Sequence, residues 1–81
     1  MYVYPETVKQ LIKKGANVNA RNYNDETPLF SAVTVETAEM LIKNGADVNA
    51  RNKLQKTPIF NAHSVELLEF LIKKGAKTFW K

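Results

Sequence analysis

The chain contains no cysteine, so neither a disulfide nor thiol chemistry can contribute to its structure or function. It has a single histidine, which leaves too few nitrogen ligands for a zinc site. No apolar run approaches the ~18 residues of a membrane span, and the N-terminus lacks a basic segment followed by an apolar one, as in a secretory signal. No Asn-x-Ser/Thr sequon occurs. We therefore expect a soluble cytoplasmic protein that binds no metal or cofactor and contacts no membrane.

The residues needed for catalysis are also missing. His63 and Ser64 are adjacent and suggest a base and a nucleophile. However, neighbours at a helix junction point apart, and no acid is placed to orient the histidine. Pairs of glutamates three residues apart fall on one exposed helix face and not across a cleft. The three glycines form no phosphate-binding loop. We expect no enzymatic activity.

The dominant feature of the chain is a repeat with a period of thirty residues. The segment LIKKGANVNARN at 11–22 returns as LIKNGADVNARN at 41–52 and in part as LIKKGA at 71–76. A second segment, TPLFSA at 27–32, returns as TPIFNA at 57–62. A fixed period of this length indicates stacked supersecondary units, each too small to bury its own apolar face. Function in such a stack lies on a shared surface more often than in a deep pocket.

These two phrases, in this order and register, resemble the ankyrin repeat across essentially the whole chain. The resemblance implies an all-α solenoid of stacked helix–turn–helix units with hairpin-tip loops, forming one domain over residues 1–81. We divide it into a partial repeat at 1–21 and repeats at 22–51 and 52–81, so that two full repeats are flanked by partial terminal ones. Ankyrin proteins bind other proteins through the tips and inner helices and carry no catalytic machinery.

Inner helices are predicted to be short. Thr27 and Thr57 are good N-caps, because a hydroxyl can accept from free amides of the first turn, and a proline follows each at the first helical position. These helices should end near Val33 and His63. The usual ankyrin repeat has thirty-three residues, and the three that are missing here should remove most of a turn from the inner helix.

Outer helices are predicted at 5–14, 35–44 and 65–74. Thr34 and Ser64 are their caps, and glycines that tolerate a left-handed conformation end them. Each carries an apolar stripe expected to be buried. The stripes are Val8-Leu11-Ile12, Val35-Ala38-Leu41-Ile42 and Val65-Leu68-Leu71-Ile72.

Two positions depart from the family pattern. Asp25 and Gln55 stand where the hairpin turn usually has glycine, and glutamine tolerates a positive φ poorly. We therefore expect a different turn, or a mobile one, at residues 52–56. Phe30 and Phe60 stand where the family often has a histidine that hydrogen-bonds the capping threonine. We expect both rings in the core, or as an apolar floor for a partner if they are partly exposed.

By resemblance, partners should touch the residues around the hairpin turns, which vary between repeats while the framework recurs. Tyr23, Arg21 and Arg51 have the chemistry of interface anchors, and Leu54 beside them is either an ordinary exposed leucine or a further anchor. The predicted partner-binding residues are Arg21, Tyr23, Asn24, Glu26, Arg51, Lys53, Leu54 and Lys56.

The chain ends and the charge distribution leave alternatives open. The terminal aromatics Tyr2, Tyr4, Phe79 and Trp80 either fold back as small caps or meet a partner or a second copy. Residues 1–50 carry a net charge of −1 and residues 51–81 of +5. The lysines either keep a small domain soluble or steer an acidic partner. Lys13, Lys43 and Lys73, with Lys14 and Lys74, either complement the helix dipoles or form a phosphate-binding stripe.

The sequence thus predicts a non-enzymatic protein–protein interaction module, a small stand-alone inhibitor or adaptor, whose partner is another protein with an acidic surface. One alternative is a basic protein that contacts nucleic acid or a ribonucleoprotein through residues 51–81. Another is a structural subunit that self-associates through its ends.

Overall fold

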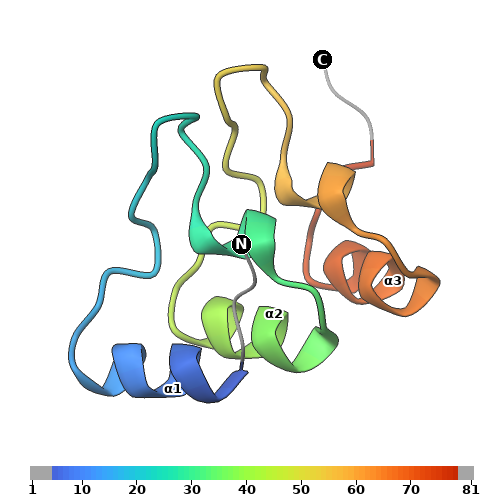
Figure 1. Cartoon of the computed structure of the whole chain (residues 1–81). Coiled ribbons are helices and arrows are strands. Elements are labelled where there is room, and N and C mark those ends of the chain that lie inside the picture. The colour runs from blue at the N-terminus through green and yellow to red at the C-terminus, as the bar shows by residue number, and fades with distance from the viewer. Residues whose placement is uncertain (1–4, 79–81) are drawn as a thin grey trace.

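The computed structural model describes residues 5–78, apart from the side chain of Pro5. Three α-helices lie side by side in one layer, and two short 3₁₀-helices lie beside them in a second layer (Figure 1). The connections between the layers project away from the helices as two hairpin loops (Figure 1). In chain order the elements are α1 (Pro5–Lys13), η1 (Pro28–Ser31), α2 (Val35–Lys43), η2 (Pro58–Asn61) and α3 (Val65–Lys73).

The outer helices form where local signals place them. The Thr34 hydroxyl accepts from the Thr37 N–H at 3.2 Å, and the Ser64 hydroxyl accepts from the Leu67 N–H at 3.1 Å. These caps satisfy amides that have no partner within the helix. Gly45 then ends α2 with φ +100°, in a conformation that glycine adopts without strain. The predicted outer helices and caps are confirmed, with each helix ending one residue earlier than predicted.

The inner helices are single 3₁₀ turns of four residues, which confirms the predicted shortening. The predicted hydroxyl caps at Thr27 and Thr57 are wrong, because both hydroxyls are buried without a hydrogen-bond partner. Each turn closes instead on the threonine carbonyl, which accepts from the N–H of Phe30 or Phe60 at 3.0 Å. A phenyl ring offers the hydroxyl no polar atom in return.

The core is deepest in the middle of the stack and shallow at both ends. Ala38 and Leu41 of α2 are 0 % and 2 % exposed. The prediction that all three apolar stripes are buried is wrong for Leu11 of α1, at 50 %, and for three side chains of α3, because no further repeat within residues 5–78 covers those faces. The exposed α3 side chains are Val65, Leu68 and Ile72.

The two phenylalanines follow the same rule. Phe30 is buried between the repeats, as predicted, whereas Phe60 at the C-terminal end of the stack is 38 % exposed. Their positions in the repeat are equivalent, and within residues 5–78 a further repeat packs beyond Phe30 but not beyond Phe60.

Asparagine side chains fix the spacing between repeats. The Asn19 side chain donates to the Gly45 carbonyl and accepts from the Asp47 N–H, both at 2.9 Å. Asn49 makes the same pair of bonds one repeat later, to Gly75 at 3.0 Å and Lys77 at 2.9 Å. Each asparagine therefore uses both polar groups of its side-chain amide in hydrogen bonds to the next repeat, and these bonds hold the two repeats in register. This fixed spacing positions the two hairpins next to each other.

Candidate functional site

The two hairpin ends, tip 1 (residues 22–26) and tip 2 (residues 52–56), have the same backbone. In tip 1 the Asn22 N–H donates to the Glu26 carbonyl and its own carbonyl accepts from the Asp25 N–H, both at 3.0 Å. In tip 2 Asn52 makes the equivalent bonds at 2.9 Å. Both tips are therefore closed turns of one type.

The side chain of the first asparagine in each tip holds this turn. Oδ1 of Asn22 accepts from the backbone N–H of Asn24 at 2.9 Å and of Glu26 at 3.0 Å. Asn52 repeats the arrangement with the amides two and four residues ahead, at 2.9 and 3.0 Å. This Asx-type turn gives the loop backbone partners that it would otherwise have to find in water. Sequence reasoning missed the role, although asparagine at the same position of both repeats was the available signal.

The expectation of a different turn at residues 52–56 is wrong. Gln55 adopts φ +65° and Asp25 adopts φ +62°, so both occupy the left-handed region. The hydrogen bonds on either side of Gln55 outweigh the cost of placing a long side chain there, which is on the order of 1–2 kcal/mol. The turn is thus set by the asparagine and not by the residue at the strained position.

Arg21 braces the two tips against each other. One terminal nitrogen of its guanidinium donates to the carbonyls of Asp25 and Arg51, each at 2.8 Å. The backbone adds a further bond, from the Lys53 N–H to the Asn24 carbonyl at 3.0 Å. Arg21 therefore has a structural role that the sequence did not reveal, and its role as a partner contact stays a prediction. Arg51 is exposed and makes no equivalent bond within residues 5–78.

The side chains that the tips display differ between the repeats. Tyr23 is 94 % exposed on tip 1 and Leu54 is 72 % exposed on tip 2. Asn24, Lys53 and Lys56 are also exposed. Glu26 is half-buried, and its carboxylate accepts from the Asn52 side chain at 3.4 Å. The structure thus brings all eight predicted tip residues onto one end of the molecule. The predicted end contacts, Tyr2, Tyr4, Phe79 and Trp80, lie outside the described residues.

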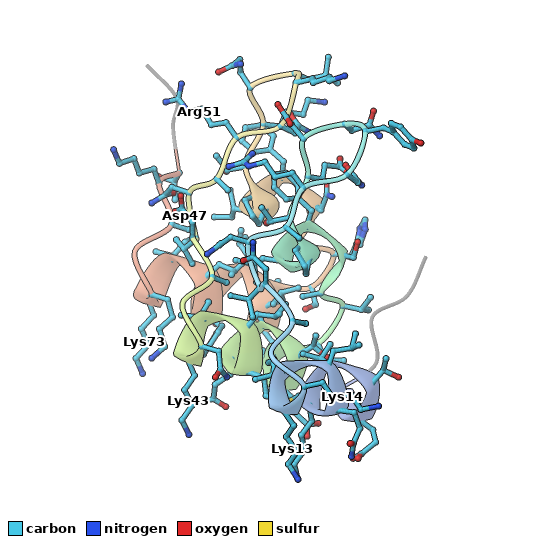
Figure 2. The ribbon with its side chains drawn as sticks, turned by 90° about the vertical axis from the view of Figure 1, so that its left-hand side faces the viewer. Lys13, Lys14, Lys43, Asp47, Arg51 and Lys73 are labelled. Atoms are coloured by element: carbon cyan, nitrogen blue, oxygen red, sulfur yellow. The ribbon has the colours of Figure 1, made fainter. Side chains whose placement is uncertain are left out.

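The lysine row lies on a separate surface. Lys13, Lys43 and Lys73 extend from the helices at the end of the molecule opposite Arg51 (Figure 2). They occupy helix C-termini, where a cation complements the helix dipole. Glu39 and Glu69 stand one helical turn before the second and third lysines, which places negative charge on the same helix face. The row is therefore less basic than its lysines alone suggest.

The adjacent histidine and serine of the sequence lie just before α3. His63 and Ser64 are exposed, and the serine hydroxyl is occupied as the cap of α3. Within residues 5–78 no three side chains of metal-ligating type come together. No helix in this part of the chain is long and apolar enough to cross a membrane.

Comparison with known proteins identifies the architecture. The family model "Ankyrin repeats (3 copies)" matches residues 1–79. The structure of the human ASB11 ankyrin repeat domain superimposes with a TM-score of 0.89 at 34% sequence identity, covering 95% of this chain and 38% of that one. The chain thus spans well under half the length of that domain. No curated protein sequence matches significantly. Together with the stacked helical units, these matches show that the chain belongs to the ankyrin-repeat family.

Proposed function

We propose that this chain binds another protein through tips 1 and 2. Ankyrin repeats are in general non-enzymatic protein–protein interaction modules. The observation that carries the proposal is that the tips combine highly exposed side chains with a fixed backbone. Tyr23 and Leu54 are 94 % and 72 % exposed, yet they stand on turns whose backbone is held by side-chain and inter-repeat hydrogen bonds.

Such an arrangement suits binding because the loops are ordered before the partner arrives. Association costs less when the contacting segments need no further ordering. Tyrosine supplies a large contact area with few rotamers to lose, and leucine can fill an apolar pocket on the partner. Arg51, Lys53 and Lys56 lie within three residues of Leu54 in the sequence, and their positive charge favours a partner with an acidic surface and speeds the encounter.

Binding at one face can be used in two ways. A compact domain of 36 × 27 × 21 Å that presents one face can act by covering its partner's surface, as an inhibitor, or by holding the partner for a third molecule, as an adaptor. The absence of cysteine accords with action in the cytoplasm.

The test is affinity capture from lysate with the chain as bait, with and without nuclease, followed by mass spectrometry. The bait is compared with the double variant Tyr23→Ala/Leu54→Asp and with Val65→Asp. Val65 is 70 % exposed, which matches Leu54, but it lies on α3 away from the tips. A discrete protein that survives nuclease, is kept by Val65→Asp and is lost by the tip variant is the expected result. Equal recovery by the tip variant would contradict the proposal.

The same experiment separates the alternatives. A contact with nucleic acid through residues 51–81 predicts recovery that disappears with nuclease and falls steeply with salt. The exposed residues Phe60 and Ile72 at one end and Leu11 at the other motivate self-association. That alternative predicts that the chain captures mainly itself and that the tip substitutions have no effect.

A further inference from the structure

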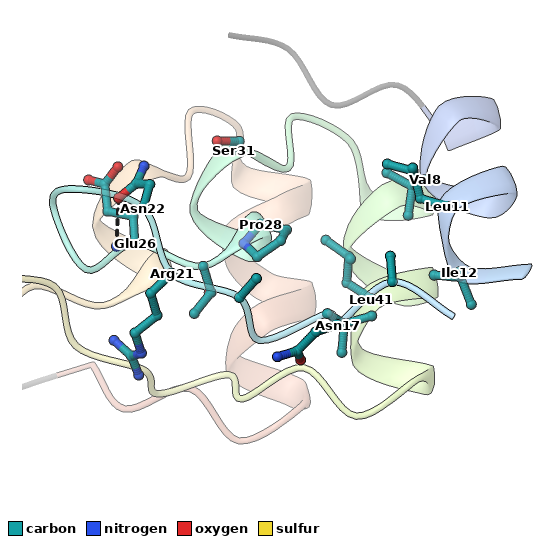
Figure 3. Close-up of a pocket in the computed structure, with 14 residues that line it drawn as sticks. Val8, Leu11, Ile12, Asn17, Arg21, Asn22, Glu26, Pro28, Ser31 and Leu41 are labelled. Carbon is teal, nitrogen blue, oxygen red and sulfur yellow. Dashed lines mark hydrogen bonds between the residues drawn. The ribbon is translucent and has the colours of Figure 1, made fainter. Parts of the chain in front are cut away.

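The open N-terminal end of the stack holds a cavity that borders tip 1, with Arg21, Asn22 and Glu26 in its lining. It has a volume of about 350 Å³ and lies between α1, η1 and the arm that leads to tip 1 (Figure 3). We call it the N-terminal pocket. Its apolar wall is formed mainly by Val8, Leu11, Ile12, Pro28 and Leu41, with Ser31 beside them.

The same surface is covered one repeat later. Leu11 is 50 % exposed, whereas Leu41, thirty residues on, is 2 % exposed. Ala20 is exposed, whereas Ala50 is 3 % exposed. Local sequence does not explain this, because the residues are identical in both pairs. The N-terminal pocket is therefore an uncovered copy of a surface that is covered inside the molecule.

The molecule itself shows what covers that surface. The 3₁₀ turn η1 packs against both α2 and η2. It buries Leu29 and Phe30, which are 3 % and 4 % exposed. One polar bond joins this contact, from the Asn61 side chain of η2 to the Phe30 carbonyl at 3.1 Å. The segment that covers this surface is therefore a turn that begins with proline, buries two large apolar side chains and offers one backbone carbonyl as an acceptor.

The N-terminal pocket offers the matching walls for such a turn. α1 replaces α2 and η1 replaces η2, each shifted by one repeat. Ser31 stands at the position of Asn61, and its hydroxyl can donate to a carbonyl as the asparagine does. The pocket thus adjoins η1, which also packs against η2.

We infer that the N-terminal pocket binds a short segment of a partner protein, a proline followed by two large apolar residues in a single 3₁₀ turn. A second folded copy does not offer this segment from η1, because its own Leu29 and Phe30 are buried. Its η2 turn does present Phe60 at 38 % exposure, so binding of a second copy is a separate outcome of the test below. Leucine or isoleucine followed by phenylalanine fits best, because the chain uses both pairs in its own turns. The site adjoins tip 1 at Asn22 and Glu26, but its lining includes neither Tyr23 nor Leu54, the side chains on which the proposed function rests.

A peptide cut from the chain itself is the probe. The capped peptide of residues 26–33, ETPLFSAV, is titrated into the ¹⁵N-labelled full chain and followed by amide chemical shifts. We expect saturable shifts at Leu11, Val18 and Ser31, with a Kd of about 0.1–1 mM for so small an interface. The same peptide carrying L29D and F30D should cause none, because it loses the apolar side chains that fill the pocket.

Matched substitutions at the two ends of the stack locate the site. Leu11→Lys lies in the N-terminal pocket and Ile72→Lys lies at the other end, at residues 50 % and 43 % exposed. The first should weaken peptide binding about tenfold or more, whereas the second should leave it unchanged, with both variants folded by circular dichroism. The tip variant Tyr23→Ala/Leu54→Asp should bind the peptide normally, so that this inference and the proposed function can fail separately.

Four results would overturn the inference. The first is the absence of saturable shifts up to about 2 mM peptide. The second is equal shifts with the aspartate-bearing peptide. The third is equal weakening by Ile72→Lys. The fourth is a change of the pocket amides on dilution without peptide, which would assign the pocket to a second copy.

Discussion

Tip 1 and tip 2 share one backbone and present different chemistry. Each is closed by an asparagine whose side chain accepts two backbone amides, and each has a non-glycine residue at positive φ. Tip 1 displays Tyr23 with Asn24, whereas tip 2 displays Leu54 between two lysines. The comparison teaches that the turn is determined by residues that recur, which leaves the intervening positions free to vary for recognition.

The largest expected effect comes from replacing the asparagine that closes one of the tips. Asn52→Ala leaves the amides of Leu54 and Lys56 without their acceptor. Since Asn52 is 8 % exposed, we expect a loss of about 2 kcal/mol in the free energy of unfolding, measured by urea denaturation. Leu54→Ala in the same tip should change it by less than about 0.5 kcal/mol. Equal losses of stability in the two variants would mean that Leu54 supports the tip as much as Asn52 does, and would contradict the division into displayed and structural residues.

The two arginines break the symmetry between the repeats. Arg21→Ala removes two bonds to backbone carbonyls, one within the first hairpin and one to Arg51 of the next, and should cost about 1 kcal/mol, because the bonds are charge-assisted but exposed. Arg51→Ala has no such bonds to lose within residues 5–78 and should have an effect near zero. The check is the difference in urea midpoint between the two variants. A larger loss for Arg51→Ala would contradict the bracing role.

The smallest effect concerns the strained position. Gln55→Gly relieves the left-handed conformation but gives the unfolded chain more freedom, so we expect a net gain of about 0.5 kcal/mol in stability. Asp25→Gly should gain less, because aspartate tolerates this conformation better than glutamine. Thermal unfolding of both variants provides the measurement. A loss of stability in Gln55→Gly would show that its side chain contributes to tip 2.

The sequence predicted well what is decided within a few residues. The outer helices follow from a cap, an apolar period and a terminating glycine, all of which act within one helix. The shortened inner helices followed from the missing residues in the repeat. Placement of the eight candidate residues on the hairpins followed from the family resemblance.

What the sequence did not predict depends on contacts between repeats. Leu11 and Leu41 are the same residue at the same position of the repeat, and the exposure of Leu11 reflects the absence of a packed repeat beside it within residues 5–78. The bracing by Arg21 needs the second tip to lie beside the first, and the partnerless Thr27 hydroxyl follows from a turn that closes on the backbone. Asn22 and Asn52 were the exception, since their recurrence was visible and their role could have been inferred.

The most direct test of the central claim exchanges residues 23–26 with residues 53–56, leaving both asparagines in place. Urea unfolding of the exchanged chain and its capture of the partner are measured side by side with the parent. The account predicts a free energy of unfolding within about 0.5 kcal/mol of the parent, together with loss of partner capture. An exchanged chain that still captures the partner, or one that unfolds, would contradict the separation of scaffold from recognition.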